Sequence, residues 1–501
     1  MPCLPQFSLV QDTLKSGSLS AGEQAYSRAQ KANALPGAFQ SYLRNLISTR
    51  QDIPLSLKSI FNSNGGASLT YGIAISRGVY CAALYGSEAI TTFNGILQDA
   101  QYMAGLSGGG CNNTKNQGFI GGLILESSRK LQAGSPVSLT DSFGISLAKH
   151  FMNGTNLGNL LDFNSLNGVG QLFSDIAKVL LDRPAFETYN LPFPVVLSTL
   201  FSNHGNPNNI LLHKVVPLSN MKFEYNIFEF GSYDPNLAAF IPMQTLGMIN
   251  ETSCIVGFDQ TAFILGSTGD IFPAVNESCR LTPNDPLVLE FAAGTAALHQ
   301  IIPQVNIRLD GALIPNPFSG QDKFSVKNEE LLTLADRGID RANLPLQPLL
   351  VKACGMQAII ALDASGNTDD NFVDGSLMIA ESKCAALFPD AYRFPQIPQT
   401  QAEFLSQNLT MQPTFFGCDE DQDTPIMLYF PNGAPPPGKP LITKASTSQL
   451  SFPDLGHIQA IINQTGEIIS WGQLQNGEAQ HGLFPVCVVC ALLKGKEHGW
   501  V

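Results

Sequence analysis

The sequence has few charged residues, and positive charge is the scarcer sign. Only 14% of its 501 residues are charged, whereas about 25% is usual in globular proteins. With 28 Lys and Arg residues against 41 Asp and Glu residues, the formal net charge is −13. Such a chain repels polyanions and lacks the basic footprint of nucleic-acid binding. We therefore expect no nucleic-acid partner.

Long hydrophobic runs are absent as well. No run approaches the 18 or more apolar residues that a membrane-spanning helix needs, so we expect no membrane span. No signal peptide is visible in residues 1–7, and residues 494–501 are too polar for a glycolipid-anchor tail. The sequence has no internal repeat, and its one low-complexity segment is the proline-rich loop at 434–440.

Metal-binding patterns are also missing. None of the seven histidines has the spacing of a metal site, and the ten cysteines are spread out rather than clustered. The segment 363–374 has oxygen ligands at EF-hand-like offsets, but Thr368 stands where glycine is required and Asp374 where glutamate is usual. We predict neither a metal ion nor a cofactor.

The cysteines and glycosylation sequons favour an extracellular protein. Ten dispersed cysteines indicate structural disulfides, with a redox pair at Cys487 and Cys490 as the weaker alternative. The N-x-Ser/Thr acceptor pattern occurs repeatedly and matters only in the secretory pathway. We expect a secreted or cell-surface glycoprotein, seen here in its mature form. The candidate glycosylation sites are Asn112, Asn153, Asn250, Asn276, Asn408 and Asn463.

The order of strands and helices predicts an α/β protein. Residues 8–50 are expected to be helical, whereas 69–75 and 357–363 have the composition of buried strands. After the strand at 69–75, a turn and a helix-like stretch at 79–90 follow. This rhythm is typical of a mostly parallel central sheet flanked by helices.

Residues 139–265 are expected to form an inserted cap or lid within a single domain of residues 1–501. Residues 139–200 read as helix and loop, and 223–230 reads as a strand-like segment rich in phenylalanine. These phenylalanines could line an acyl pocket, although core packing is their commoner role.

A glycine-rich turn surrounds Ser107. Gly105, Ser107 and Gly109 fit the G-x-S-x-G pattern of a nucleophile elbow, since glycine permits a sharp turn between strand and helix. An ordinary surface loop is the alternative. A serine nucleophile also needs a base and donors for the oxyanion. A Ser-His-Asp triad stays open, although no histidine is marked as its member.

Residues 334–350 carry a more specific signal. Asp336, followed by Asn343, Pro345 and Pro348, resembles the Asp-Gly-Gly block and the Asn-x-Pro-Leu-x-Pro-Leu run of fungal lysophospholipases (phospholipase B). Other segments resemble that family in the same order along nearly the whole chain, which is more specific than any single motif. They are 71–76, 98–109, 228–235, 254–260 and 484–493.

The resemblance implies a fold similar to cytosolic phospholipase A2 and patatin, with a Ser-Asp dyad that uses neither histidine nor metal. Ser107 would be the nucleophile, and Asp336 its general base. Backbone N–H groups of Gly78, Val79 and Gly108 would hold the oxyanion. The implied reaction is hydrolysis of a fatty-acyl ester of a lysophospholipid or phospholipid at a membrane or micelle surface.

Two motifs depart from the family pattern. Arg77 and Val79 replace oxyanion glycines, and Cys81 replaces an arginine expected to pair with substrate phosphate. Loss of that charge-assisted hydrogen bond could weaken binding by about 1.5–3 kcal/mol. After Asp336, Arg337 replaces a glycine. A cation there would favour the ionised carboxylate, unless its side chain points outward.

The residues after Ser107 depart too. The segment 108–118 consists of poor helix formers where a nucleophile elbow should start a helix, and a sugar on Asn112 would obstruct lipid entry. Two alternatives to a lysophospholipase therefore stay open. One is a catalytically silent family member that binds lipid or a protein partner, and the other is an esterase for uncharged acyl substrates.

Overall fold

The structure is a computed structural model, and the chain divides into two compact units. The first unit comprises residues 1–18, 106–179 and 196–342, and the second comprises 19–105, 180–195 and 343–501. The residues that the structure describes are 11–12, 19–49, 70–75, 100–105, 127–151, 172–174, 189, 192–202, 217, 219–248, 257–270, 272–273, 309–340, 343–366, 368, 372–421, 423–433, 455–470 and 484–492.

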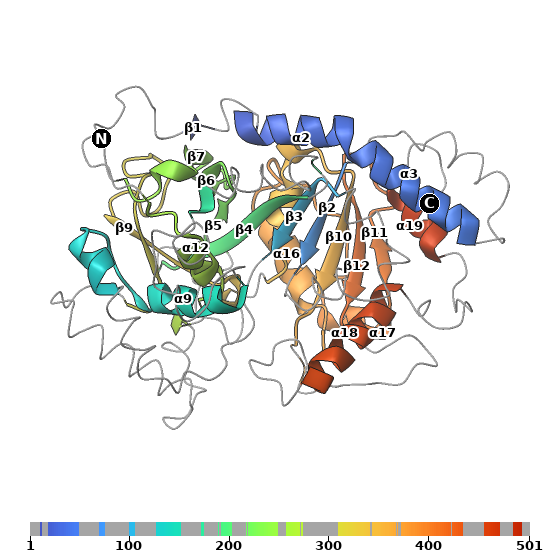
Figure 1. Cartoon of the computed structure of the whole chain (residues 1–501). Helices are drawn as coiled ribbons and strands as arrows, with labels where there is room; N and C mark the ends of the chain where they lie inside the picture. Colours follow the sequence, from blue (N-terminus) through green and yellow to red (C-terminus); the bar gives the residue numbers. More distant parts are fainter. Residues whose placement is uncertain are drawn as a thin grey trace. The chain divides into compact units, whose positions relative to one another are not determined.

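The second unit is built on a mostly parallel sheet (Figure 1). Four neighbouring strands run parallel, and a short fifth strand pairs antiparallel at the edge. Every residue of β2, β10 and β12 is buried, as is typical of parallel strands covered on both faces. In spatial order the strands are β3 (Tyr102–Gly105), β2 (Tyr71–Ile75), β10 (Ala358–Asp363), β12 (Ile426–Pro431) and β11 (Thr414–Phe416).

This arrangement confirms the predicted α/β fold with a mostly parallel central sheet, and the strands expected at 69–75 and 357–363 are present. The helices expected within 8–50 are α2 (Ala21–Asn33) and α3 (Leu35–Thr49). Helix α2 begins after Ser20, whose side chain accepts a hydrogen bond from the N–H of Glu23 at 3.2 Å.

The second unit contains further helices along its C-terminal half. Among them, α17 begins with a capping box in which Thr400 and Glu403 exchange hydrogen bonds between side chain and backbone. The helices and 3₁₀ turns are α15 (Gln347–Leu350), η4 (Lys352–Cys354), α16 (Ser376–Ala386), α17 (Gln401–Ser406), α18 (Leu455–Ser470) and α19 (Phe484–Leu492).

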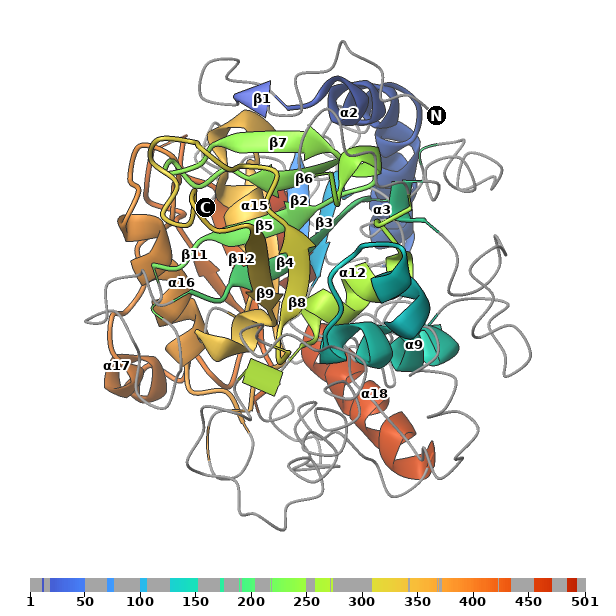
Figure 2. The same cartoon turned by 90° about the vertical axis from the view of Figure 1, so that its left-hand side faces the viewer.

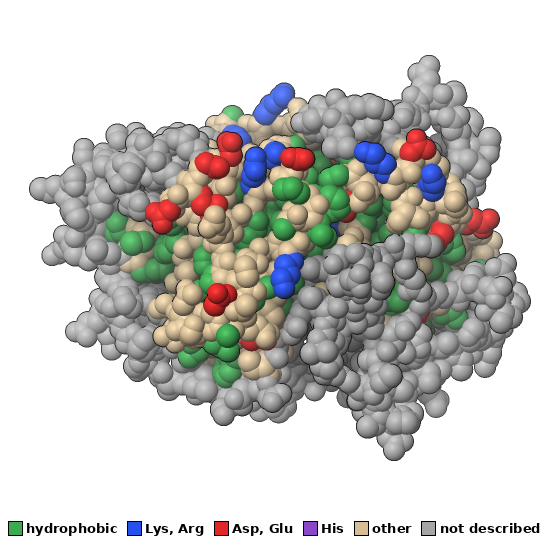
Figure 3. Space-filling model, turned by 180° about the vertical axis from the view of Figure 1, so that it is seen from behind, with side chains coloured by type: hydrophobic (Ala, Val, Ile, Leu, Met, Phe, Trp, Pro, Cys, Tyr) green, Lys and Arg blue, Asp and Glu red, His purple; other side chains and the backbone are tan. Residues whose placement is uncertain are grey.

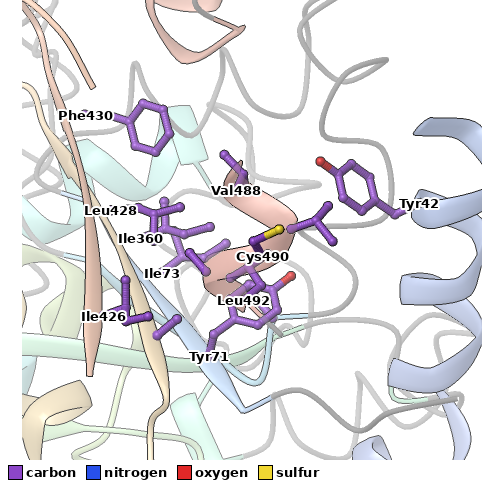
Figure 4. Packing of buried hydrophobic residues seen from close by; sticks show 14 of the residues in the cluster. Tyr42, Tyr71, Ile73, Ile360, Ile426, Leu428, Phe430, Val488, Cys490 and Leu492 are labelled. Carbon is purple, nitrogen blue, oxygen red and sulfur yellow. The ribbon is translucent and has the colours of Figure 1, made fainter. Parts of the chain in front are cut away.

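Strand register organises the core of the second unit. Ile73, Ile360 and Leu428 are paired across three strands, so their side chains emerge in one row on the same face. Helices α3 and α19 cover this face, with Tyr42 and Val488 among the covering side chains (Figure 4). In α3 the buried positions follow the i, i+3, i+4, i+7 spacing of an amphipathic helix. They are Phe39, Tyr42, Leu43 and Leu46.

The first unit contains antiparallel strands that lie side by side (Figure 2). Strand β4 begins in the second unit, and its residues Val196–Thr199 pair with β5 in the first unit. Strand β9 pairs with the end of β4 and with β8. The strands are β1 (Gln11–Asp12), β7 (Ala239–Pro242), β6 (Glu229–Ser232), β5 (Lys222–Tyr225), β4 (Phe193–Leu200), β9 (Leu331–Ala335) and β8 (Ala312–Pro315).

Two expectations for this region were met only in part. Residues 139–200 end in the strand β4 rather than in loop, although Pro192 and Pro194 lie at its start. The segment 223–230 forms parts of two strands, because the side chain of Asn226 accepts hydrogen bonds from the N–H groups of Phe228 and Glu229, each at 2.9 Å, and turns the chain.

The phenylalanines of this hairpin belong to the core. Phe223 and Phe230 are fully buried, and their rings stack with centroids 5.1 Å apart. Phe318 and Phe324 complete the cluster. Core packing, and not the lining of an acyl pocket, is therefore the role of Phe223 and Phe230 in this structure.

Helices α9 (Leu139–Phe151) and α12 (Thr261–Thr268) cross at two glycines. A Cβ at Gly144 would lie 2.2 Å from the carbonyl oxygen of Ala262, and one at Gly266 would lie 2.8 Å from Cα of Gly144. Only glycine permits such close backbones.

The assignment of residues 139–265 to a cap and of residues 1–501 to one domain stays a prediction.

The described helices include none that is both long and apolar enough to cross a membrane. On the face shown in Figure 3, acidic and basic side chains of the described residues are scattered among neutral and apolar ones.

The buried row of Ile73, Ile360 and Leu428 predicts that truncating the β12 side chain strongly lowers the stability of the fold. Replacing the buried Leu428 by alanine should lower the free energy of unfolding by about 2–5 kcal/mol, because a cavity forms under α3 and α19. Urea unfolding measures this. Leu405→Ala is the matched control, since Leu405 is 52% exposed and its truncation should change stability by less than about 0.5 kcal/mol. Equal losses in both variants would contradict the assigned core.

Candidate functional site

Of the residues assigned to catalysis, the structure describes Asp336 alone. Ser107 and the oxyanion candidates Gly78, Val79 and Gly108 lie outside the described residues. Arg77, Cys81 and the segment 108–118 also lie outside them, as do the sequons at Asn112, Asn153, Asn250 and Asn276.

The strands that lead to these segments are described. Strand β2 ends at Ile75, just before the predicted oxyanion segment, and β3 ends at Gly105, just before Ser107. Ile75 and Gly105 are paired in register across the two parallel strands. The predicted oxyanion and nucleophile segments therefore start from neighbouring positions at the carboxyl edge of the sheet, where open α/β folds bind their ligands.

Asp336 lies between β9 and the 3₁₀ turn η3 (Arg337–Ile339) of the first unit. It occupies the N-cap of η3 and is only 2% exposed. Its Oδ1 accepts a hydrogen bond from the N–H of Gly338 at 2.5 Å, and its own N–H donates to the carbonyl oxygen of Asp270 at 3.0 Å. Aspartate is a favoured N-cap residue because its side chain accepts such backbone N–H bonds.

Two further buried carboxyl groups, Asp270 and Asp310, interact electrostatically in the same unit. Asp270 accepts hydrogen bonds from the hydroxyl of Thr140 at Oδ2 and from the N–H of Phe272 at Oδ1. Burial raises the pKa of Asp270 well above its usual range, and the charges of Asp310 and Asp336 raise it further, against the opposing effect of the two hydrogen bonds. The environment of Asp336 is therefore a buried acidic one.

Arg337 does not point outward. Its side chain is completely buried directly after Asp336, so the outward orientation considered from the sequence is wrong. A guanidinium group therefore lies inside the first unit.

Asp270 carried no signal in the sequence. Its partner Thr140 is 130 residues distant, and neither residue lies in a recognisable motif. The sequence likewise gave no sign of the buried ion pair between Lys222 and Asp340, whose members are 118 residues apart. These contacts are created by tertiary packing alone.

No group of three or more His, Cys, Asp or Glu side chains within the described part of the chain is arranged to hold a metal ion. In the EF-hand-like segment, Asp363 accepts hydrogen bonds from the hydroxyl of Tyr429 at 2.8 Å and from the N–H of Ser365 at 2.9 Å. Asp374 likewise accepts from the N–H of Ser376 at 2.9 Å. Both carboxylates thus serve as hydrogen-bond acceptors in the fold.

Cys487 and Cys490 both lie in α19, and both are free thiols. The expectation of a disulfide is therefore not met at these two positions. Burial raises the pKa of the Cys490 thiol to about 11. Because the thiolate is the reactive form, this shift also argues against a redox pair.

Two sequon asparagines are described, and both are exposed. Asn408 lies in a turn after α17 with a left-handed φ of 57°, which asparagine tolerates better than most residues. Asn463 lies within α18, where its side-chain oxygen accepts a hydrogen bond from Gln459 at 2.8 Å.

Comparison with known proteins adds a family match. Residues 110–498 match the family described as the lysophospholipase catalytic domain. "Probable lysophospholipase 5" of Schizosaccharomyces pombe is 27% identical, across 96% of this chain and 81% of that protein. "Lysophospholipase 2" of Candida albicans is 26% identical, across 98% and 84%. "Lysophospholipase 1" of Saccharomyces cerevisiae is 28% identical, across 92% and 74%.

The fold is similar to that of a solved structure as well. Human GIVD cytosolic phospholipase A2 superimposes with a TM-score of 0.63 at 14% sequence identity, over 99% of this chain and 67% of that chain. This similarity confirms the cytosolic phospholipase A2-like fold expected from the sequence.

The buried Asp270 predicts an unusual dependence of stability on pH. Its folded pKa lies above the usual 3.8, so the folded chain binds a proton that the unfolded chain has lost. The free energy of unfolding should therefore fall as pH rises from about 4 through the raised pKa. Asp270→Asn should flatten this dependence, because the amide keeps its oxygen for Phe272 and can donate to Thr140.

Urea unfolding at several pH values between 4 and 8 measures the effect. Asp322→Asn, which alters an exposed aspartate of the same unit, should leave the dependence unchanged. A wild-type stability that rises over this range while Asp270→Asn behaves identically would contradict the assignment.

Proposed function

The chain belongs to the family of lysophospholipase catalytic domains, and from this premise we propose that it hydrolyses fatty-acyl esters of lysophospholipids or phospholipids through a Ser107–Asp336 dyad. The family is one of lipid ester hydrolases. The observation that carries the finer proposal is the register of β2 and β3, from which the oxyanion and nucleophile segments start at adjacent positions.

In this mechanism the Ser107 hydroxyl attacks the ester carbonyl while the Asp336 carboxylate accepts its proton. Backbone N–H groups of Gly78, Val79 and Gly108 stabilise the oxyanion of the tetrahedral intermediate. The intermediate collapses to an acyl-enzyme, and Asp336 returns the proton to the leaving alcohol. Water then attacks the acyl-enzyme and loses a proton to Asp336. Asp336 passes this proton to the departing Ser107 oxygen, so that the fatty acid is released and both residues return to their starting state.

The surroundings of Asp336 support the role of a positioned base. The carboxyl group is nearly removed from water, and its orientation is restrained by the N–H of Gly338. A base held in this manner needs little reorganisation during proton transfer. No histidine is needed in this scheme.

The altered oxyanion segment supports two competing functions. With Arg77 and Val79 in place of glycines, the backbone donors could be lost, and the chain would then bind lipid or a partner without catalysis. With Cys81 in place of a phosphate-pairing arginine, the preferred substrate would instead be an uncharged acyl ester.

We also propose that the protein is secreted or exposed at the cell surface, carries N-linked glycans, and meets its substrate at a membrane or micelle surface. The sequons and the number of cysteines support this location.

Fluorophosphonate labelling tests the dyad. We expect one adduct on wild-type protein by intact mass, no adduct on Ser107→Ala, and labelling of Asp336→Asn slowed by about 10²–10⁴-fold through loss of the base. A solved structure of human GIVD cytosolic phospholipase A2 holds methyl gamma-linolenyl fluorophosphonate as an inhibitor, which supports the choice of probe. Equal labelling of wild type and Ser107→Ala would remove Ser107 from the mechanism.

Fatty-acid release then separates the substrate classes. Faster release from lysophosphatidylcholine than from a monoacylglycerol with the same chain supports the proposed reaction. The reverse order supports the esterase, and no serine-dependent adduct or release from either substrate supports the silent protein.

Glycosylation is tested at Asn408. When the chain is expressed behind a secretion signal in a yeast host, Asn408→Gln should lose the mass of one glycan. Treatment with peptide N-glycosidase should bring wild type and variant to the same mass, apart from the substitution. An unchanged glycan mass in Asn408→Gln would show that this exposed sequon is unused.

A further inference from the structure

The 3₁₀ turn that begins after Asp336 has three residues and is too short to be stable without outside contacts. Asp336 is the N-cap of η3, and Asp340 is its C-cap. The turn has two backbone hydrogen bonds, from the N–H of Ile339 to the oxygen of Asp336 at 3.2 Å and from the N–H of Asp340 to the oxygen of Arg337 at 3.3 Å. Both are long, and 3₁₀ hydrogen bonds have poor geometry. Besides the hydrogen bond from the N–H of Gly338, the orientation of Asp336 therefore depends on what anchors the two ends of the turn.

The upstream end is anchored by the backbone. Ala335 is paired with Thr199 across β9 and β4, and the N–H of Asp336 donates to the carbonyl oxygen of Asp270. These contacts fix the chain up to Asp336. They leave the other side of the turn to be held separately.

The downstream end is anchored by a buried ion pair. The ammonium group of Lys222 contacts Oδ2 of Asp340, and the hydroxyl of Thr199 lies 3.4 Å from the same oxygen. The two charged side chains are only 5% and 0% exposed. Lys222 also donates to the carbonyl oxygen of Asn220 at 2.5 Å, so its ammonium group is held in place.

Strand register makes both anchors parts of one row. Thr199 is paired with Ala335 on one side and with Lys222 on the other. The three residues thus form a row across β9, β4 and β5 immediately before Asp336. Since a buried charge cannot leave its partner without a large cost, the pair restrains the turn more firmly than a surface ion pair would.

We infer that Lys222 is a positioning residue for the reaction, which acts through Asp340 to hold the 3₁₀ turn that presents the Asp336 carboxylate. The inference rests on the proposed function, in which Asp336 is the general base. Lys222 contacts neither substrate nor reacting atoms in this role. Because proton transfer is sensitive to displacements of about 1 Å, release of the turn should lower kcat more than it changes KM.

Kinetics on the full chain test the inference. Lys222→Met should lower kcat for fatty-acid release by about 10–100-fold and change KM by less than about threefold. Lys222→Arg, which keeps the charge, should recover part of kcat. The matched control is Lys130→Met, which breaks another ion pair of the first unit, between Lys130 and Asp141, and should keep kcat within about twofold of wild type.

A second variant separates loss of positioning from misfolding. Lys222→Met alone leaves the Asp340 charge buried, whereas Lys222→Met/Asp340→Leu removes both charges and should fold. It should show the same loss of kcat. Unchanged kcat in this folded double variant would overturn the inference, as would equal losses of kcat in Lys222→Met and Lys130→Met.

Hydrogen exchange separates this inference from the proposed function. The amides of residues 337–340 should exchange faster in the double variant than in wild type and Lys130→Met. If wild type shows neither release nor labelling, the proposed function fails, and with it the positioning role of Lys222 in the reaction. Exchange then still decides whether the ion pair holds the turn, and unchanged protection would overturn that part too.

Discussion

Parallel pairing of β2 with β3 is the constraint on which the candidate site depends. Parallel strands end at the same edge of a sheet, and Ile75 lies opposite Gly105, so the segments assigned to the oxyanion and the nucleophile start side by side. The same pairing sets the core, because strands buried on both faces must be apolar and must be covered. Helices α3 and α19 supply one cover. The packing of the second unit and the starting points of the two predicted segments thus follow from one arrangement.

The first unit buries several ionisable side chains, and burial disfavours the charged form of each one. Asp270, Asp336, Asp340 and Lys222 are all nearly inaccessible to water, where an unpartnered charge is very unfavourable. Each has partners: backbone N–H groups for Asp336 and Asp270, and an ion pair for Asp340 and Lys222. The N–H partners of Asp336 and Asp270 are local, two residues further along the chain in each case. The ion pair between Lys222 and Asp340 and the hydrogen bond from Thr140 to Asp270 instead join distant parts of the unit.

Sequence reasoning succeeded where a pattern is local. Apolar β-branched runs predicted β2 and β10, and the resemblance around Asp336 predicted the family, which the match over residues 110–498 shows. It failed where prolines or a turn interrupt the pattern, and where the environment of a side chain depends on residues that are distant in sequence. Prolines concealed β4, and one asparagine turned the expected strand at 223–230 into a hairpin. The burial of Arg337 could not be predicted, because a charged residue after a strand is usually exposed.

The sequence by itself determined the fold class and the family, because these depend on residue order. The assignment of Ser107 and Asp336 to the catalytic positions stays a prediction. Tertiary structure alone decided that Asp270 lies beside the backbone of Asp336, that Arg337 is buried, and that Lys222 meets Asp340 across 118 residues. Strand register sets such contacts, and register arises only when the strands pair. Electrostatic effects inside a protein depend on distance and burial, neither of which sequence spacing specifies.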